Sequence, residues 1–166
     1  MSLSREQRLA QEFWDFSCAL YAQDEVKQLC LQCQDEHDLS VNLLLFCLWQ
    51  GGPCKQVLQS EFFQCDLAEF ERVNREVLEP FRKKRRNSSQ KTQAPWLYKT
   101  MLEIELKLER QVQQTLVAAV VVSKHVVRAT TPTAALMNLG AYLQYRGISP
   151  GQALLEKLRQ LVRCLE

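Results

Sequence analysis

Apolar residues recur at helical spacing along most of this chain of 166 residues, and that periodicity limits the possible folds more than any other feature. Near the start, apolar residues follow one another at intervals of three or four, which predicts a helix over about residues 4–22. Its apolar face consists of Leu9, Phe13, Phe16 and Leu20. Ser4 and Gln7 have the spacing of a capping box, so we expect them to form its first turn.

The same periodicity predicts two more helices before residue 52. One begins near Asp24, and its apolar stripe consists of Val26, Leu29, Cys30, Cys33 and His37. The other runs from Val41 to Gln50, with Ser40 as its N-cap and a Gly-Gly-Pro sequence at its end. Because this third segment is apolar on nearly all sides, we expect it at the centre of the fold.

Between residues 55 and 95 the helical signals are weaker. A short helix is predicted around residues 55–64, and Asp66 with Glu69 forms a second capping box that opens another helix. Pro80 lies within that pattern and is expected to kink or end the helix. The polar stretch 87–95 predicts a loop, and its last residue, Pro95, precedes a long helix.

The valine-rich segment from Leu116 to Val127 fits either a strand or a helix tail. We interpret it as a helix tail, because no partner strand is evident elsewhere. Further helices are predicted over about residues 131–166, where two prolines follow capping residues and Gly147 separates the segments. The prediction is an all-α, single-domain bundle of six to eight helices over residues 1–166, with no sheet.

Seven cysteines, most of them in apolar periodic segments, suggest thiols kept reduced, so we expect a cytoplasmic protein. The charged N-terminus does not resemble a secretory signal. The longest apolar run, Leu116 to Val122, is too short to span a membrane.

Charge is distributed unevenly along the chain. Residues 1–79 contain 6 Lys and Arg against 14 Asp and Glu, whereas residues 80–166 contain 15 against 5. The halves can neutralise each other in the fold, or the basic half can face an anionic partner such as nucleic acid or a lipid surface. We favour neutralisation.

The sequence CLQCQDEH, residues 30–37, has the Cys-x-x-Cys spacing of half a zinc site. The two cysteines lie within a helical stripe, without the turn that such ligands usually occupy. A second ligand pair is also missing, since Cys47 lies in an apolar run and Cys54 and Cys65 are isolated. We therefore predict core cysteines and no metal. His125 is interpreted as a surface histidine or one with satisfied hydrogen bonds.

Several short patterns resemble a proteobacterial family of uncharacterised helical proteins, of the kind found in Pseudomonas and Vibrio. The patterns are Trp14-x-Phe16, Leu20-Tyr21, Cys30-Leu31-x-x-Gln34-Asp35-x-His37, Val41-Asn42-Leu43-Leu44-Leu45, Leu48-Trp49, Pro80-Phe81-Arg82-x-x-Arg85 and Glu103-x-Glu105-x-x-x-Glu109-Arg110. The resemblance covers about residues 13–110 and implies a cytoplasmic helical protein, without implying an activity. In that family leucine is common at the position of Cys33, which also argues against a metal site.

One candidate site is a polar pocket around the turn between the second and third helices. Its side chains are Gln34, Asp35, His37 and Asn42. A carboxylate and an imidazole together suit acid-base or ligand-binding chemistry. The other interpretation is a junction whose polar groups satisfy unpaired backbone groups at the helix ends, and we favour it.

The second candidate site is a basic run made of Arg82, Lys83, Lys84, Arg85 and Arg86. Phosphate groups or an acidic protein surface would suit these cations. On a helix, Arg82, Arg85 and Arg86 share one face, with the lysines to the sides. Solvated cations at a helix end are the other interpretation.

The third candidate site is an apolar groove for a partner helix, made of Trp14, Phe16 and Trp49, although core packing also explains these residues.

No catalytic residue and no cofactor are predicted, because nucleophile patterns and glycine-rich phosphate loops are missing. The leading hypothesis is a non-enzymatic interaction or regulatory module that binds a protein or nucleic acid. The alternative is a small-ligand binder or enzyme that uses the polar pocket, with Arg82 and Arg85 as an anion clamp.

Overall fold

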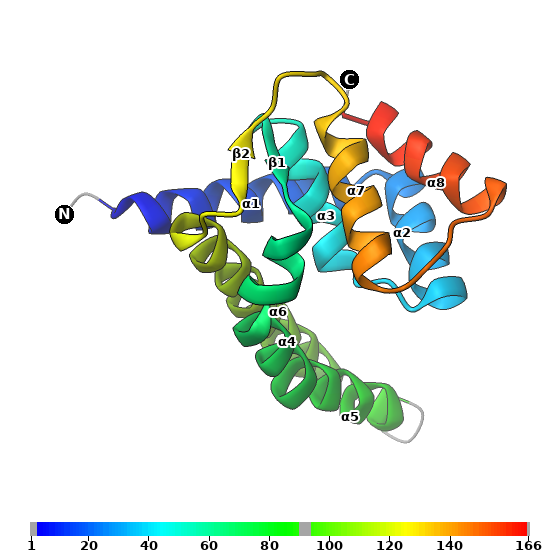
Figure 1. Cartoon of the computed structure of the whole chain (residues 1–166). Coiled ribbons are helices and arrows are strands. Elements are labelled where there is room, and N and C mark those ends of the chain that lie inside the picture. Colours follow the sequence, from blue (N-terminus) through cyan, green and yellow to red (C-terminus); the bar gives the residue numbers. More distant parts are fainter. Residues whose placement is uncertain (1–2, 90–93, 166) are drawn as a thin grey trace.

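The computed structural model describes residues 3–89 and 94–165, and within them it is a helical bundle, as predicted. Eight α-helices are present in the described ranges: α1 (Arg5–Tyr21), α2 (Asp24–His37), α3 (Val41–Gly51), α4 (Ala68–Val73), α5 (Glu79–Ser89), α6 (Pro95–Val122), α7 (Ala134–Tyr145) and α8 (Gln152–Arg163). Two π-helical turns, η1 (Phe62–Asp66) and η2 (Asn74–Leu78), flank α4. Figure 1 shows a body formed by α1, α2, α3, α7 and α8, from which α5 and α6 extend as an arm.

Helix α3 lies at the centre of the body, and every residue from Asn42 to Gly51 is buried. Phe13 of α1 packs against Phe46 and Trp49 of α3, with ring centroids 5.2 and 5.0 Å apart. On its other side α3 contacts α7 so closely that a Cβ at Gly51 would lie 2.1 Å from the backbone nitrogen of Ala135. The apolar character of α3 on all sides therefore corresponds to burial on all sides.

Local sequence chemistry accounts for several helix ends. Ser4 and Gln7 form the predicted capping box of α1, and the Ser40 hydroxyl accepts the backbone N–H of Leu43 at the start of α3. Gly147 follows α7 with φ of +65°, a left-handed conformation in which glycine meets no steric penalty. The capping prediction for Asp66 and Glu69 is wrong, because α4 has no side-chain cap.

A short antiparallel sheet corrects the prediction that the fold has no strands. Strand β1 (Gln56–Leu58) replaces the start of the helix predicted over residues 55–64, and it pairs with β2 (Val126–Arg128). Helix α6 ends at Val122 and the chain is extended at Ser123, so the helix-tail prediction holds only to that point. Strand β1 supplies hydrogen-bond partners for the β-branched pair Val126 and Val127, which lie about 70 residues away in sequence.

The α5–α6 arm is a helical hairpin. Pro80 lies near the start of α5 without ending the helical path, because the wide turn η2 directly precedes it and accommodates the missing N–H group. Helix α5 extends to Ser89, so the first part of the predicted loop 87–95 is helical, and residues 90–93 lie outside the described residues. With 28 residues, α6 is ~42 Å long and reaches from the tip of the arm into the body.

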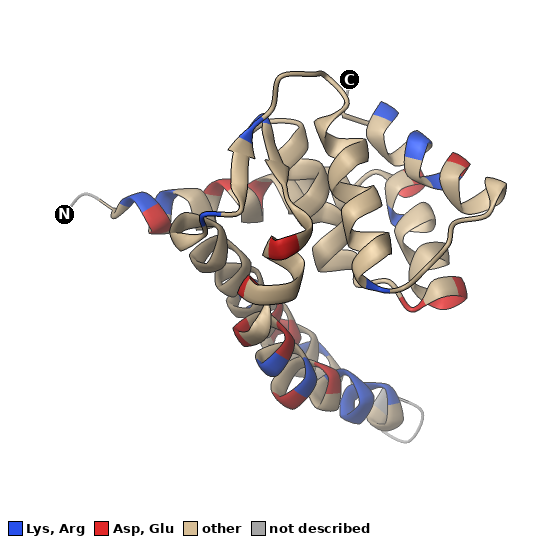
Figure 2. Ribbon diagram, in the orientation of Figure 1, with Lys and Arg blue, Asp and Glu red and all other residues tan. Residues whose placement is uncertain are grey.

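Figure 2 shows acidic and basic residues interspersed along the arm, with basic residues together towards its tip. In the body, Arg146 pairs with Asp38 at 2.9 Å and Lys157 pairs with Glu36, so basic residues of the second half meet acidic residues of the first. Within the described ranges, none of the helices combines the length and the apolar character that crossing a bilayer requires.

Candidate functional site

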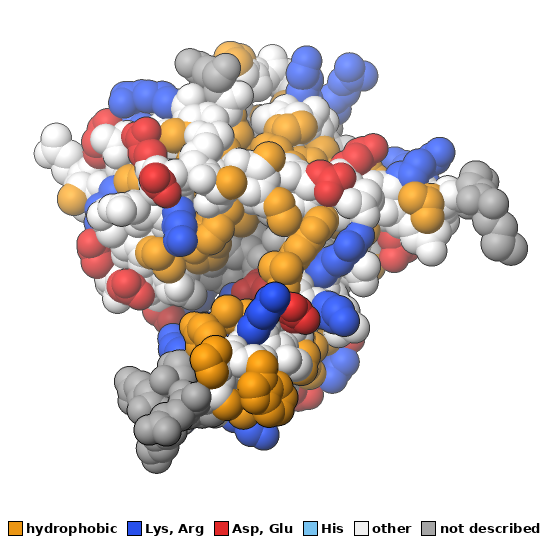
Figure 3. All heavy atoms as spheres, turned by 180° about the vertical axis from the view of Figure 1, so that it is seen from behind, with side chains coloured by type: hydrophobic (Ala, Val, Ile, Leu, Met, Phe, Trp, Pro, Cys, Tyr) orange, Lys and Arg blue, Asp and Glu red, His pale blue; other side chains and the backbone are white. Residues whose placement is uncertain are grey.

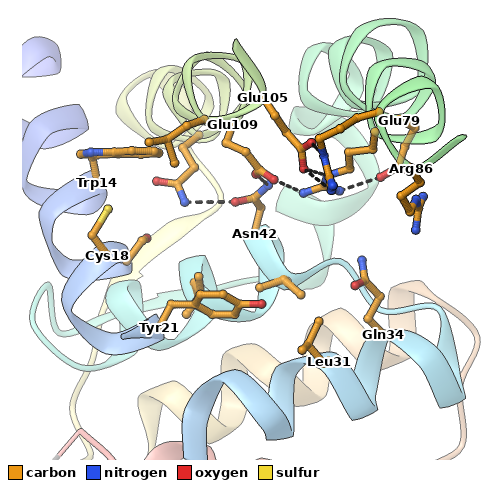
Figure 4. A pocket seen from close by; sticks show the side chains of 17 residues that line it. Trp14, Cys18, Tyr21, Leu31, Gln34, Asn42, Glu79, Arg86, Glu105 and Glu109 are labelled. Carbon is orange, nitrogen blue, oxygen red and sulfur yellow. Dashed lines mark hydrogen bonds and ion pairs between the residues drawn. The ribbon is translucent and has the colours of Figure 1, made fainter. Parts of the chain in front are cut away.

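A cleft of about 420 Å³ lies between the α5–α6 arm and the body. Helices α1, α2, α3, α5 and α6 all contribute side chains to it. The view from behind in Figure 3 shows the surface hollowed between the arm and the body, and Figure 4 shows the side chains that line the cleft. Its volume lies within the usual range for small-molecule pockets.

One wall of the cleft is a network of ion pairs between α5 and α6. Arg82 donates to Glu79 at 2.8 Å and also pairs with Glu109, while Arg85 pairs with Glu105. The side chains of Arg82, Arg85, Glu105 and Glu109 are only 14–21% exposed. Burial opposes the charge of Arg82, but the carboxylates of Glu109 and Glu79 outweigh that effect and raise the pKa of the guanidinium.

A chain of side-chain amides leads from this wall towards the body. Asn42 Nδ2 donates to Glu109 Oε2 at 2.8 Å, and Gln113 Nε2 donates to Asn42 Oδ1 at 3.0 Å. A carboxylate accepts but does not donate, so Glu109 fixes the orientation of Asn42, and Asn42 then fixes that of Gln113. The remaining oxygen, Gln113 Oε1, is buried without a hydrogen-bond partner among the described residues.

The opposite wall comes from α1. Trp14, Ser17, Cys18 and Tyr21 line it, and Figure 4 shows Trp14 and Tyr21 at different heights along that helix. The guanidinium carbon of Arg110 lies 5.6 Å from the centroid of the Trp14 ring. Ser17 Oγ is buried and, like Gln113 Oε1, has no partner in the described part of the chain.

Two of the four residues in the predicted polar pocket line this cleft. They are Gln34, from α2, and Asn42, from α3. Asp35 is exposed, because successive helical residues are rotated by 100° and Gln34 already faces the cleft. His37 ends α2, where its Nε2 lies 3.8 Å from Glu36 Oε2. The structure therefore does not bring Asp35 and His37 to the cleft.

The residues of the predicted basic run also lie partly inside and partly outside the cleft. Arg82, Arg85 and Arg86 all line the cleft, while Lys83 and Lys84 are exposed. Since Arg82 and Arg85 are already paired with three glutamates, the run does not present five cations to a partner.

The three aromatic residues of the predicted groove lie in different places. Trp14 lines the cleft, whereas Trp49 is a core residue with 2% exposure. Phe16 lines a separate shallow hollow, together with Gly52 and Pro53. These residues do not form one groove.

Sequence reasoning missed Ser17, Glu79 and Gln113 as site residues, and it noticed Glu105 and Glu109 only through the family resemblance. A signal for the α6 residues exists in the spacing, because Glu105, Glu109 and Gln113 are four residues apart and thus share one face of α6. When a stripe of polar residues continues into the buried end of a helix, these residues either form hydrogen bonds within the core or line a binding site.

A second polar cluster, also missed, joins the end of α6 to η1. Ser123 Oγ donates to Asp66 Oδ2, and His125 Nδ1 lies 3.0 Å from the same oxygen. Burial raises the pKa of Asp66, but the hydrogen bonds from Ser123 and His125 outweigh it and lower that pKa. Because Ser123 donates to the carboxylate and not to the imidazole, this geometry does not activate the hydroxyl as a nucleophile.

Cys30 and Cys33 are fully buried in the apolar core. Burial raises the pKa of the Cys30 thiol to about 12, so it stays neutral at physiological pH. Within residues 3–89 and 94–165, no group of three or more His, Cys, Asp or Glu side chains is placed to hold a metal ion.

Comparison with known proteins gives a match to a protein family. A family model described as "Protein of unknown function (DUF2390)" matches residues 12–116, which include every lining residue of the cleft named above. No curated protein and no solved structure matches the chain.

Proposed function

This chain belongs to the DUF2390 family of proteins of unknown function, and we propose that it binds a small molecule in the cleft between the α5–α6 arm and the body. The observation that carries this proposal is Gln113 Oε1, a buried acceptor without a partner in the described residues, on a side chain that helps to line the cleft. An unsatisfied buried polar group costs about 1–3 kcal/mol. A ligand that donates to this oxygen would recover that free energy.

The character of the lining supports binding more than catalysis. Cys18 is the one thiol among the lining residues, and burial together with the charge of Asp15 raises its pKa, which disfavours the thiolate. Asp35 and His37, the acid-base candidates, lie outside the cleft. The hypothesis of an anion clamp is weakened as well, since an anion would compete with Glu79, Glu105 and Glu109 for Arg82 and Arg85.

The test is a fragment screen read by NMR of ¹⁵N-labelled protein. The side-chain NH₂ signals of Asn42 and Gln113 report directly on the cleft. We expect fragments that shift these two signals together. If a diverse library yields no fragment that shifts them, the proposal fails.

A matched pair of variants separates binding from folding. Gln50 and Gln113 are both buried glutamines whose Oε1 has no partner in the described residues, but Gln50 does not line the cleft. Gln113→Leu should weaken the fragment hits at least about tenfold, because the acceptor is lost. Gln50→Leu should leave them unchanged, and equal losses in both variants would contradict a site at Gln113.

A second candidate function, binding of a protein partner, is supported by apolar side chains on the first half of α6. Trp96 is 70% exposed, and Tyr98 and Leu102, two and six residues further along the helix, are 37% and 41% exposed. Figure 3 shows apolar side chains gathered on the arm. Lys83 and Lys84 are exposed on the same arm, so the partner we propose has an apolar face bordered by carboxylates.

Co-purification from the native host, with and without nuclease, tests this second candidate. A stoichiometric protein that survives nuclease and is lost with Trp96→Ser and Leu102→Ser would support it. Met137→Ser, at an exposed apolar residue on α7, is the control. Nuclease-sensitive binding would instead indicate nucleic acid.

Cytoplasmic location stays a prediction from the cysteine content, and cell fractionation tests it.

A further inference from the structure

The cleft contains enough fixed chemistry to define a class of ligand, which is an inference that rests on the proposed function. We infer that the ligand is an uncharged aromatic amide or lactam, which donates an N–H to Gln113 Oε1. Three properties of the lining lead to this class: the direction of its hydrogen bonds, its charge balance and its aromatic wall.

The direction of the hydrogen bonds follows from the amide chain. Glu109 is only an acceptor, so Asn42 must point its NH₂ group at Glu109 and its oxygen at Gln113. Gln113 in turn donates an N–H to Asn42, which leaves its oxygen as the unused group of a residue that lines the cleft. The ligand therefore needs a donor at this position. Ser17 is 97% buried, and its Oγ also lacks a partner in the described residues. A hydroxyl can donate or accept, so this one suits the carbonyl of an amide.

Charge balance favours an uncharged ligand. The lining contains Glu79, Glu105 and Glu109 together with Arg82, Arg85 and Arg86, three charges of each sign. Four of these groups form ion pairs that are mostly shielded from solvent. A charged ligand would have to replace one partner of such a pair and leave the other uncompensated, which is unfavourable in a partly buried site.

The aromatic wall favours a ring. Trp14 and Tyr21 are seven residues apart on α1, so they lie two turns, or about 10 Å, apart on one face of the helix. The guanidinium of Arg110 lies over the Trp14 ring. Leu31 and Leu106 add apolar surface to the same cleft. An aromatic ring would bury its faces against this surface, while its amide reaches Gln113.

Four compounds with the same phenyl ring test these properties separately. Benzamide is uncharged and has the donor, and N,N-dimethylbenzamide is uncharged and lacks it. Benzoate is an anion without a donor, and benzamidine is a cation with donors. Titration of the Asn42 and Gln113 side-chain signals gives a Kd for each compound. We expect benzamide to bind about tenfold more tightly than each of the other three.

In Gln113→Leu the Asn42 signal alone gives the Kd values. This variant should lose the preference for benzamide over its dimethyl derivative, so that the ratio of the two Kd values is close to one, whereas Gln50→Leu should preserve the ratio. The ratio does not depend on how much protein is folded. The inference is overturned if benzoate or benzamidine binds as tightly as benzamide, if methylation has no effect, or if none of the four binds. When none binds but the fragment screen finds cleft ligands, only the ligand class is wrong. When the screen also fails, the proposed function is wrong too.

Discussion

Asn138 and Gln113 are both buried side-chain amides, yet their surroundings differ in one respect. Asn138, on α7, is fully buried, and its oxygen accepts the backbone N–H of Leu58 at 2.8 Å. Its NH₂ group donates to the carbonyls of Gln56 and Cys47, at 3.0 and 3.3 Å. Gln113, on α6, donates to Asn42 but its oxygen has no partner in the described residues. Only the second amide has capacity left for another molecule.

This difference suggests how to separate polar groups that serve the fold from polar groups that bind a ligand. A buried amide with all hydrogen bonds made within the protein serves the fold, and Asn138 joins β1 to α3 and α7. A buried amide with an unused acceptor beside a cavity is a poor structural element, because it contributes a desolvation cost. The predictions below test this distinction.

The largest expected effect is on Asn138. Asn138→Leu removes three hydrogen bonds. It leaves the N–H of Leu58 and the carbonyl of Gln56 without the partner that Asn138 supplies, whereas the carbonyl of Cys47 keeps the N–H of Gly51 within α3. At about 1–3 kcal/mol for each unsatisfied group, and with some relaxation, we expect the free energy of unfolding to fall by about 4 kcal/mol. Urea denaturation measures it.

Gln144→Leu is the control for this prediction, since Gln144 is an exposed amide on the same helix. It should change stability by less than about 0.5 kcal/mol. A similar loss in both variants would show that leucine on α7, and not the hydrogen bonds of Asn138, is responsible.

The next effect concerns the ion-pair wall. Arg82→Gln leaves Glu79 and Glu109 without their cation, and we expect a loss of about 2 kcal/mol, less than for a fully buried pair because these groups are partly exposed. Lys83→Gln removes the neighbouring exposed cation and should cost less than about 0.5 kcal/mol. Thermal unfolding gives the melting temperatures of the two variants. Equal melting temperatures would mean that the ion pairs of this wall do not stabilise the arm.

A smaller effect, below about 1 kcal/mol, is expected for Asp66, the carboxylate bound by Ser123 and His125. Because folding lowers the pKa of Asp66 from 3.8, the charged form stabilises the fold above that pH. The stability difference between the protein and Asp66→Asn should shrink as the pH falls below about 4. Urea denaturation above and below this pH would contradict the prediction if the difference grew in acid.

The sequence predicted the helices well where local chemistry sets their ends. Ser4, Ser40, Pro95 and Gly147 each act on their own turn of backbone, so short-range patterns suffice. The sheet was missed because β1 and β2 have three residues each, and their pairing joins segments that are far apart in sequence. Periodicity over three residues does not distinguish a strand from a turn.

The cleft was predictable only in part. Gln34 and Asn42 were proposed together because they flank one turn, and Arg82 and Arg85 because they share a helical face. The orientation of the α5–α6 arm brings these pairs together, and no local pattern encodes that orientation. Ser17 and Gln113 became apparent as site residues only once burial and hydrogen bonds were known.

The smallest expected effect on stability is that of Gln113→Leu, and this variant is the most direct test of the comparison between Asn138 and Gln113. Gln113→Leu removes the hydrogen bond to Asn42, but it also removes the unsatisfied oxygen and its desolvation cost. The two changes oppose each other, so we expect the free energy of unfolding to stay within about 1 kcal/mol of the unmodified protein, as measured by urea denaturation. A loss as large as that of Asn138→Leu would make Gln113 a structural amide. A small loss together with weakened fragment binding would leave ligand recognition as the reason for burying this side chain beside a cavity.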